Sequence, residues 1–464
     1  MELKFIKKMI KRLFLYSDKI QNEKITLAIQ SHTHNLRNIE SELNLLQLRI
    51  DHLQNTLFQF KDTSKITIGF LVHNANLFIS SYSVYLSLKE ECQVIVYATT
   101  NNYPQFEHYA ADEKIQKNME ALYKHYNIKA RPIATIQDLI AQGIPDILFL
   151  QTPFDEHRPE NFSAKFLSNF TKICYIPYSI TVAELPSFHY GIDFFNYCWR
   201  IFLESPESID MCKQHLDANT YEKRKKKISI SGHPKLDLLK NHIVNNEKID
   251  TCWNLPRSAD IKRIIWAPHW SIKWFDKNGF CQFKKYYSYF LKLLTDQTKI
   301  DLVMRPHELM FDALIKHNEM TLQEVDNFME EFTSHKNASI DTTEIYLDLF
   351  HTSDAMITDG VSFLAEYQIT KKPIIYTENT DNGPILNQYG MLLVSGLYKA
   401  HNEHDLDHFI NEVVFRGQDD LYNARIQALE NHLYHPSIGS GEYIKMDIIE
   451  NLRLAHKKQL YGVS

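Results

Sequence analysis

The sequence predicts two parallel-sheet α/β domains that face a cleft, preceded by an α-helical coiled coil. An amphipathic helix and a heptad array occupy residues 1–62, after which apolar runs alternate with helical stretches over residues 63–225 and again over residues 226–464. Strands that alternate with helices are typical of parallel βαβ units. We therefore expect domain boundaries near residues 62 and 225, and ligand chemistry at the carboxyl ends of the strands.

The composition supports a chain with a large core and gives few other constraints. Of its 464 residues, 44% are hydrophobic and 12% aromatic, which suits a globular protein of two or three domains. The net charge of −6 gives no reason to expect nucleic acid as a partner. The six cysteines form no CxxC pair, so the sequence indicates neither a zinc site nor a disulfide framework. A reducing cytoplasm fits this usage best.

The first residues, "MELKFIKKMIKRLFLY", have an amphipathic and basic pattern. No apolar run in the chain reaches the roughly 18–20 residues that span a bilayer. Lysines and arginines interrupt the opening stretch, so a secretory signal is not indicated either. Two interpretations remain open: the helix lies on an anionic membrane surface, or it packs against its own protein. Its apolar positions at helical spacing are Phe5, Ile6, Met9, Ile10, Leu13 and Phe14.

The heptad array continues without a break for five heptads, which is the coiled-coil pattern. Its a positions are Ile29, Leu36, Leu43, Ile50 and Leu57, and its d positions are His32, Ile39, Leu46, Leu53 and Phe60. Such a narrow apolar seam favours a partner helix over a broad core, so we predict a homo-oligomer. The alternative is a long helix packed on its own globule. The mixture of Ile and Leu at a leaves the number of strands open.

Each α/β region shows the same succession of elements. In the first, "KITIGFLVH" predicts a strand, "SSYSVYLSLKEE" a helix and "CQVIVYATT" a strand, and "DILFLQT" and "KICYIPYS" predict two more strands. In the second, the predicted strands are "KISISG", "RIIWAPHW", "IDLVMRPHE", "DAMITDG" and "KPIIYTE". Each apolar run of the second region ends directly in polar or charged residues.

Four of these strand ends together suggest an electropositive pocket. Lysine, arginine and three histidines at one edge of a sheet suit a diphosphate. Any one of them alone is explained as a surface histidine, a proline that ends a strand, or an arginine paired with a carboxylate. The residues are Gly232, His233 and Lys235; His269; Arg305 and His307; and Thr358, Asp359, Gly360 and Ser362.

The segment "TDGVSFLAE" is expected to contribute a helix N-terminus, whose free N–H groups and positive dipole end favour phosphate. Hydroxyls at Thr358 and Ser362 add donors, and Glu366 lies one helical turn further on. A carboxylate in that position suits the hydroxyls of a ribose. The simpler interpretation is an Asp-Gly helix cap followed by a solvated glutamate.

In this order, "SGHPKLDLL", "IIWAPHWS", "LVMRPHELMF" and "SDAMITDGVSFLAEYQITKKPIIY" resemble the CDP-glycerol glycerophosphotransferase family, over roughly residues 66–450. "DILFLQTPFDEHRPENF" and "KICYIPYSI" resemble its capsule-type branch. The resemblance implies a GT-B fold, in which two Rossmann-like domains face a cleft and the C-terminal one binds the nucleotide. It also implies transfer of a polyol phosphate, usually glycerol phosphate, from a CDP-linked donor to a hydroxyl, with release of CMP.

The resemblance carries one residue over directly and shows several departures. The family's histidine in its "HP" motif matches His307. The proline that usually follows is Glu308, the family's paired serines are replaced by Gly360 and Val361, and the aromatic residue of "GxP" is His233. The "WHG" motif of other members is absent from the N-terminal half, where "YIPYS" stands in its place.

These residues suggest an in-line attack of a hydroxyl on the β-phosphorus, with catalysis mainly by positioning and electrostatics. Arg305, Lys235 and the turn at residues 360–362 would hold the diphosphate. His307 and His269 would donate hydrogen bonds to it or protonate the departing phosphate. The general base is expected at His73, with His189 as the alternative. No aspartate-rich motif occurs, so we expect no obligatory metal or other cofactor.

Two other functions fit the same pattern. A nucleotide-sugar glycosyltransferase would use the same fold, and a catalytically inactive scaffold would use the coiled coil to organise a capsule complex. For the enzyme, we expect a cytoplasmic location, peripheral on the inner face of a bacterial membrane. The acceptor would be a lipid-linked polymer or primer, and the N-terminal helix and coiled coil would tether several copies beside it.

Overall fold

The computed structural model describes residues 47–48, 66–102, 109–184, 193–214, 216–242, 252–274, 277–343, 345–383 and 385–461, the last seven by their backbone alone. The predicted amphipathic helix lies outside the described residues, as does the predicted coiled coil except for residues 47–48. His189, the alternative base, also lies outside them.

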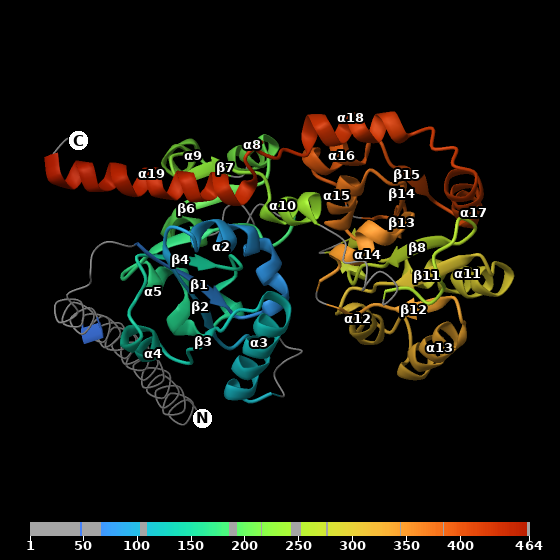
Figure 1. Cartoon of the computed structure of the whole chain (residues 1–464), viewed down its shortest axis with the longest axis horizontal. Helices are drawn as coiled ribbons and strands as arrows, with labels where there is room; N and C mark the ends of the chain where they lie inside the picture. Colours follow the sequence, from blue (N-terminus) through green and yellow to red (C-terminus); the bar gives the residue numbers. More distant parts are fainter. Residues whose placement is uncertain are drawn as a thin grey trace, which may run out of the picture. The chain divides into compact units, whose positions relative to one another are not determined.

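The first α/β domain is built on a seven-stranded parallel sheet with the order β3-β2-β1-β4-β5-β6-β7 (Figure 1). Its strands are β1 (Thr67–Val72), β2 (Gln93–Ala98), β3 (Arg131–Pro132), β4 (Ile147–Leu150), β5 (Lys172–Tyr175), β6 (Cys198–Leu203) and β7 (Ile228–Ile230). The order reverses between β1 and β4, where the chain returns to the middle of the sheet.

Helical segments connect these strands, and α10 follows the last of them. They are η1 (Ala75–Ser80), α2 (Tyr82–Leu88), α3 (Ala111–Tyr126), α4 (Ile136–Ala141), η3 (Asp155–His157), η4 (Glu160–Phe162), α5 (Ala164–Leu167), α7 (Phe194–Tyr197), α8 (Pro206–Gln214), α9 (Ala218–Lys225) and α10 (Pro234–Asn241). The longest, α3, ends at Asn127 in the left-handed region with φ 53°, where a short polar side chain is tolerated.

The second α/β domain has a six-stranded parallel sheet with the order β12-β11-β8-β13-β14-β15. Its strands are β8 (Lys262–Ala267), β11 (Ile300–Met304), β12 (Ala338–Ile340), β13 (Ala355–Thr358), β14 (Ile374–Thr377) and β15 (Tyr398–Ala400). A separate antiparallel ribbon joins β9 (Lys273–Trp274) to β10 (Lys277–Asn278). The order reverses between β8 and β13, the position where open α/β sheets bind ligands.

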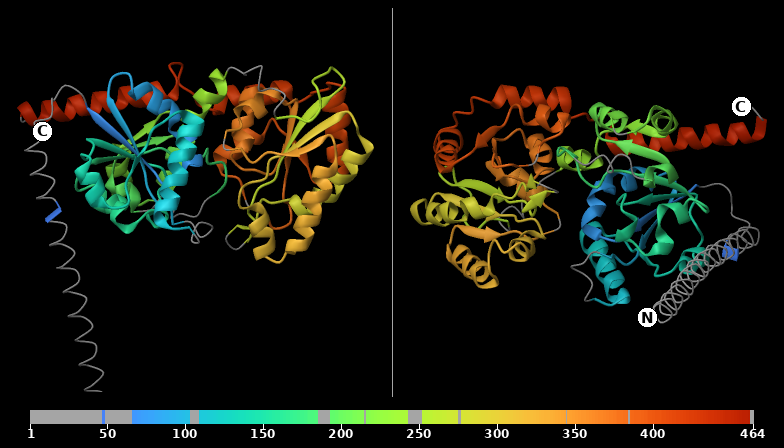
Figure 2. Two further views of the ribbon diagram at one scale, coloured as in Figure 1. Left: turned by 60° about the horizontal axis from the view of Figure 1, so that its bottom comes forward. Right: turned by 180° about the vertical axis from the view of Figure 1, so that it is seen from behind.

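Helices lie on both faces of this sheet, as Figure 2 shows. They are α11 (Phe283–Asp296), α12 (Met310–Lys316), α13 (Leu322–Ser334), α14 (Leu347–Thr352), α15 (Phe363–Glu366), η6 (Tyr367–Thr370), α16 (Gln388–Val394), α17 (Glu403–His408), the π-helical η7 (Phe409–Phe415) and α18 (Tyr422–His432). The last helix of the chain is α19 (Ser440–Tyr461).

Strand β8 explains why apolar runs form the centre of the second sheet. Ile264 and Trp266 pack into one core cluster with α11 and α13, whereas Ile265 and Ala267 pack into the cluster on the other face. Successive side chains point to opposite faces, so a strand covered on both sides needs a continuous apolar run. The predicted pair of parallel α/β domains is therefore confirmed.

The boundary predicted at residue 225 differs from the structure. Strand β7, which we assigned to the second domain, is the edge strand of the first sheet. Helix α19 also returns to the first domain, because Ile444 and Ile448 are fully buried in the core cluster that contains Ile68 and Phe70. Asp447 accepts hydrogen bonds from Arg200 of β6, one of them at 2.7 Å.

Among the described residues, no helix is long and apolar enough to cross a membrane.

Candidate functional site

A pocket of about 620 Å³ lies at the carboxyl ends of β8, β11, β12 and β13. The first domain contributes Asn76, Leu77 and the loop after β5, residues 177–183. The pocket is therefore lined by both α/β domains and lies at the order reversal of the second sheet. The predicted site residues that line it are Lys235, His269, Arg305, His307, Gly360 and Ser362.

The six other predicted residues do not line this pocket; they are His73, Gly232, His233, Thr358, Asp359 and Glu366. All of them except the glycine have side chains that are no more than 2% exposed. Gly232 has φ +68°, and a Cβ there would come within 2.8 Å of the Tyr434 carbonyl oxygen. Close backbone packing therefore explains this glycine without a phosphate.

The two cations of the pocket are held by one connected network. Lys235 Nζ lies 3.1 Å from Glu366 Oε1, and the Tyr346 hydroxyl donates to the other oxygen of the same carboxylate. The guanidinium of Arg305 pairs with Asp341 and lies over the Tyr346 ring, with its carbon 4.9 Å from the ring centroid. Tyr346 thus connects the two cations. Its hydroxyl binds Glu366, the partner of Lys235, and its ring makes a cation–π contact with Arg305.

The network changes the interpretation of Glu366. Its side chain is completely buried, and its two oxygens bind Lys235 and Tyr346. It presents no surface to the pocket, so the described structure does not place it where a ribose would contact it. Burial raises the pKa of Tyr346 well above its usual range, which keeps the phenol protonated as a donor to Glu366. Glu366 therefore fixes the position of Lys235.

The three strand-end histidines share one local geometry. In each, ring Nδ1 accepts the backbone N–H two residues further on: His233 from Lys235 at 3.2 Å, His269 from Ser271 at 3.3 Å and His307 from Leu309 at 3.2 Å. A nitrogen that accepts a hydrogen bond carries no proton, so the neutral ring has its proton on Nε2. In His233, Nε2 donates to the Pro177 carbonyl oxygen at 2.9 Å.

Burial also disfavours the charged form of these rings. It lowers the pKa of His233 to about 3 and that of His307 to about 4, and it lowers the pKa of His269 well below its ordinary value. The His269 and His307 rings lie 5.6 Å apart, centroid to centroid. At neutral pH they are uncharged N–H donors, so the positive charge expected at this edge comes from Arg305 and Lys235 alone.

The turn after β13 is held internally. The Thr358 hydroxyl donates to the Ala267 carbonyl oxygen at 2.7 Å and accepts the Gly360 N–H at 2.8 Å. Asp359 accepts the backbone N–H groups of His269 and Gln282, both at 2.5 Å, and burial raises the pKa of its carboxyl to about 7. Thr358 and Asp359 thus join the loops after β8 and β13.

The predicted helix N-terminus is a weak feature. Helix α15 has only four residues before the chain tightens into η6. A single turn has a small dipole, so the positive end expected at residues 360–362 contributes less than a full-length helix would.

His73 directly follows β1, at the strand end where it was expected, but its side chain does not line the pocket. That side chain is fully buried. Its backbone is bound to the side chains of Gln151 and Asn118, at 2.9 and 2.8 Å. Burial, followed by nearby Arg158, lowers its pKa well below the usual value. Asn76 and Leu77 line the pocket from η1, the helical segment that begins two residues after His73.

Sequence reasoning missed Asp341 and Tyr346, and it treated Glu308 only as a departure from the family. Asp341 directly follows β12, so the rule that polar residues after a strand belong to the site would have found it. Glu308 accepts a hydrogen bond from Asn76 Nδ2 of the first domain at 3.3 Å, and partial desolvation raises the pKa of its carboxyl. Nothing local in the sequence indicated the role of Tyr346.

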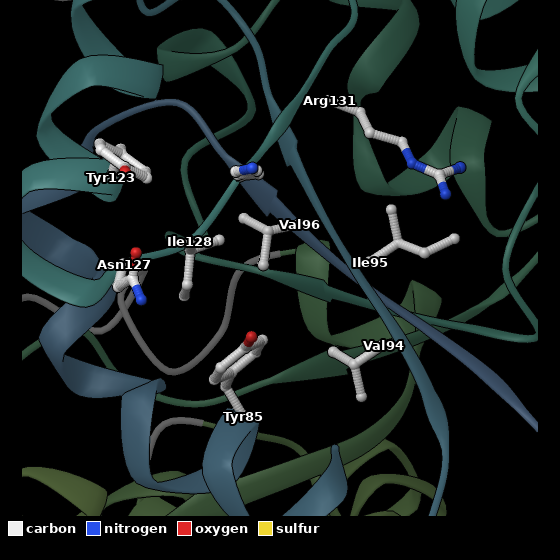
Figure 3. Close-up of a pocket in the computed structure, with 9 residues that line it drawn as sticks. Tyr85, Val94, Ile95, Val96, Tyr123, Asn127, Ile128 and Arg131 are labelled. Carbon is white, nitrogen blue, oxygen red and sulfur yellow. The ribbon is translucent and has the colours of Figure 1, made fainter.

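A second cavity, of about 520 Å³, lies beside β2 in the first domain (Figure 3). None of the predicted site residues lines it. Its walls are Tyr85, Val94, Ile95, Val96, Tyr123, Asn127, Ile128, Lys129 and Arg131. Within the described part of the chain, no group of three or more His, Cys, Asp or Glu is placed to hold a metal ion.

Comparison with known proteins supports the resemblance. The profile of the CDP-glycerol:poly(glycerophosphate) glycerophosphotransferase family matches residues 204–382, which contain most of the residues that line the pocket. No protein of curated function matches the chain by sequence.

Solved structures resemble the chain over most of its length. A variant of the wall teichoic acid polymerase TagF soaked with CDPG has TM-score 0.53 and 17% identity, over 88% of this chain and 99% of that one. UDP-GlcNAc 2-epimerase from Neisseria meningitidis bound to UDP-GlcNAc has TM-score 0.54 and 11% identity, over 84% and 100%. MnaA of S. aureus with UDP has TM-score 0.54 and 13% identity, over 84% and 97%. These likenesses establish a GT-B-like fold.

Proposed function

We propose that this enzyme transfers a polyol phosphate from a CDP-activated donor, with release of CMP, because residues 204–382 match the profile of the CDP-glycerol:poly(glycerophosphate) glycerophosphotransferase family. Glycerol phosphate is the proposed group. The proposed acceptor is a hydroxyl of a membrane-linked polymer or primer in the synthesis of a teichoic-acid-like or capsular polymer.

The pocket at the carboxyl ends of β8, β11 and β13 is the observation that carries the proposal. It brings Arg305 and Lys235 together with two neutral imidazoles. A diphosphate needs positive charge and several N–H donors, and this group of residues supplies both. The volume of about 620 Å³ is within the range of small-ligand sites.

In the proposed reaction, the acceptor hydroxyl attacks the β-phosphorus in line with the bridging oxygen of CMP. Negative charge grows on the bridging and non-bridging oxygens, where fixed donors are most effective. Arg305 and Lys235 would neutralise this charge. His269 and His307 would donate from Nε2, and their low pKa values argue against a role as acids at neutral pH.

The acceptor and the membrane association rest on the N-terminal sequence and on the pocket's composition. The loop 177–183 and Leu77 give the first-domain side of the pocket an apolar wall, against which a glycerol backbone or lipid-proximal sugar would lie. The basic amphipathic start and the heptads of residues 1–62 would bring several copies to an anionic membrane.

A donor panel tests the proposal. The purified full-length chain is incubated with CDP-glycerol, CDP-ribitol, UDP-GlcNAc or UDP-glucose, each with and without a lipid-linked glycerol phosphate primer, and CMP or UDP release is measured. We expect CMP release from a CDP-polyol that depends on the primer. Release of UDP alone would establish the glycosyltransferase alternative, and no binding of any nucleotide would support the inactive scaffold.

A further inference from the structure

The proposed reaction needs a group that accepts the proton of the attacking hydroxyl, and the expected bases do not fit. His73 does not line the pocket. His269 and His307 line it, but Nδ1 of each ring already accepts a backbone N–H. The remaining nitrogen, Nε2, then carries the proton and cannot receive another one from the substrate. These histidines are donors by geometry.

Other pocket side chains are also unsuited to this role. Lys235 is paired with Glu366, and Tyr346 donates its hydroxyl proton to the same carboxylate. Burial raises the pKa of Tyr178, which disfavours a phenolate base. Among the described residues that line the pocket, this leaves two carboxylates, Asp341 and Glu308.

These two carboxylates differ in how fully they are engaged. Asp341 Oδ2 pairs with Arg305, and Oδ1 accepts both the backbone N–H and the hydroxyl of Thr343, at 3.1 and 2.7 Å. Glu308 accepts one long hydrogen bond at Oε2, 3.3 Å from Asn76 Nδ2. Asp341 is therefore committed to holding Arg305, whereas Glu308 retains acceptor capacity beside the donor imidazole of His307.

We propose that Glu308 is the general base, a role that rests on the proposed transfer of a phosphoryl-linked polyol. The acceptor hydroxyl would give its proton to the Glu308 carboxylate as its oxygen forms a bond to the β-phosphorus. The bond from that phosphorus to the bridging oxygen breaks, and CMP leaves with the electron pair. Protonated Glu308 then returns its proton to solvent.

The surroundings of Glu308 suit this task. Glu308 is exposed to solvent, partial desolvation raises the pKa of its carboxyl, and the bond from Asn76 opposes that shift. A base whose pKa moves from the acidic range toward neutrality is stronger while still ionised at working pH. The bond to Asn76 places the carboxylate against a first-domain residue, and that domain is expected to bring the acceptor. The proline that the family usually has at this position would have no such group.

The pH profile should report Glu308 directly. The other charged or titratable side chains of the pocket are Lys235, Arg305 and Asp341, which are ion-paired, His269 and His307, which are neutral, and the tyrosines Tyr175, Tyr178 and Tyr346. As pH falls, protonation of Glu308 should reduce kcat with a midpoint above 4.5, the ordinary value for glutamate.

The test compares full-length Glu308→Gln, Glu308→Asp and the control Glu430→Gln with the wild-type chain. Glu430 is exposed on α18, outside the pocket. Primer-dependent CMP release, CDP-polyol binding by calorimetry and thermal unfolding are measured for each. We expect Glu308→Gln to lower kcat by about 10²–10⁴-fold and to lose the acidic limb, with donor affinity nearly unchanged. Glu308→Asp should keep part of kcat and the limb, and Glu430→Gln should match wild type.

Retention of kcat within about threefold in Glu308→Gln would overturn the assignment, as would an unchanged acidic limb. A Glu308→Gln chain that fails to fold leaves the decision to Glu308→Asp: an unshifted profile at full rate would refute the role. A wild-type chain that binds and turns over no CDP-polyol would refute the proposed function itself. An active wild type with an active Glu308→Gln would refute only the base.

Discussion

Replacing Glu366 by glutamine distinguishes a ligand contact from a buried structural ion. The side chain of Lys235 is 10% exposed and that of Glu366 is 0% exposed. The Glu366→Gln side chain would carry no charge to balance the ammonium group, and it would weaken the bond from Tyr346. Removal of one partner of a buried ion pair costs about 3–5 kcal/mol, because the remaining charge stays buried without compensation.

That cost predicts a large change in thermal stability. For domains of 150–250 residues, 1 kcal/mol shifts Tm by about 2–4 °C, so Glu366→Gln should lower Tm by about 6–20 °C. Calorimetry of the full-length chain measures this value, with Glu430→Gln as the exposed control. The single variant Lys235→Met and the double variant Lys235→Met with Glu366→Gln complete the comparison. The double variant contains neither buried charge, so its decrease in Tm should be smaller than the sum of the decreases in the two single variants.

A different result is expected if Glu366 binds the ribose. Glu366→Gln would then weaken the affinity for the donor, and the Tm of the ligand-free variant would stay within about 2 °C of the wild-type Tm. That outcome would refute the assignment of Glu366 as the partner that positions Lys235, and with it the network through Tyr346.

Three further predictions concern other parts of the chain. Burial raises the pKa of Glu204 to about 7, so between about pH 4.5 and 7 the folded state holds a proton that the unfolded state has released. The folded state therefore loses stability as pH rises through that window. From pH 5 to 8, the Tm of Glu204→Gln should rise relative to that of wild type. Arg305→Lys keeps the charge but loses the planar group that lies on Tyr346, so the donor KM should rise about tenfold in the CMP-release assay. Removal of residues 1–61 should give a monomer by light scattering, and an oligomeric truncated chain would contradict the predicted coiled coil.

Much of the fold was predictable because each central strand must be apolar on both faces. "RIIWAPHW" and "IDLVMRPHE" therefore appeared as strands, and β8 and β11 occupy their apolar parts. The strand in "KISISG" was also found, but its sheet was not. Pairing between β6 and β7 depends on tertiary contacts that no local pattern records, so β7 was assigned to the wrong side of the boundary.

The site was predictable to the extent that strand ends share an edge. His269, Arg305 and His307 follow different strands and meet in one pocket for that reason. Partnerships across long separations were not accessible: Lys235 and Glu366 lie 131 residues apart in the chain. The protonated nitrogen of each histidine depends on a backbone turn, and composition or spacing gives no information on it.

The return of α19 to the first domain affects how the chain folds during synthesis. The core around Ile68 and Phe70 is incomplete until Ile444 and Ile448 have left the ribosome. After Ile230 at the end of β7, the ribosome must add 231 residues to reach Tyr461 at the end of α19. At about 5–20 residues per second this takes about 10–50 s. During that interval the apolar side chains that α19 covers lack their partners, so we expect the nascent first domain to need chaperones and C-terminal truncation to destabilise it.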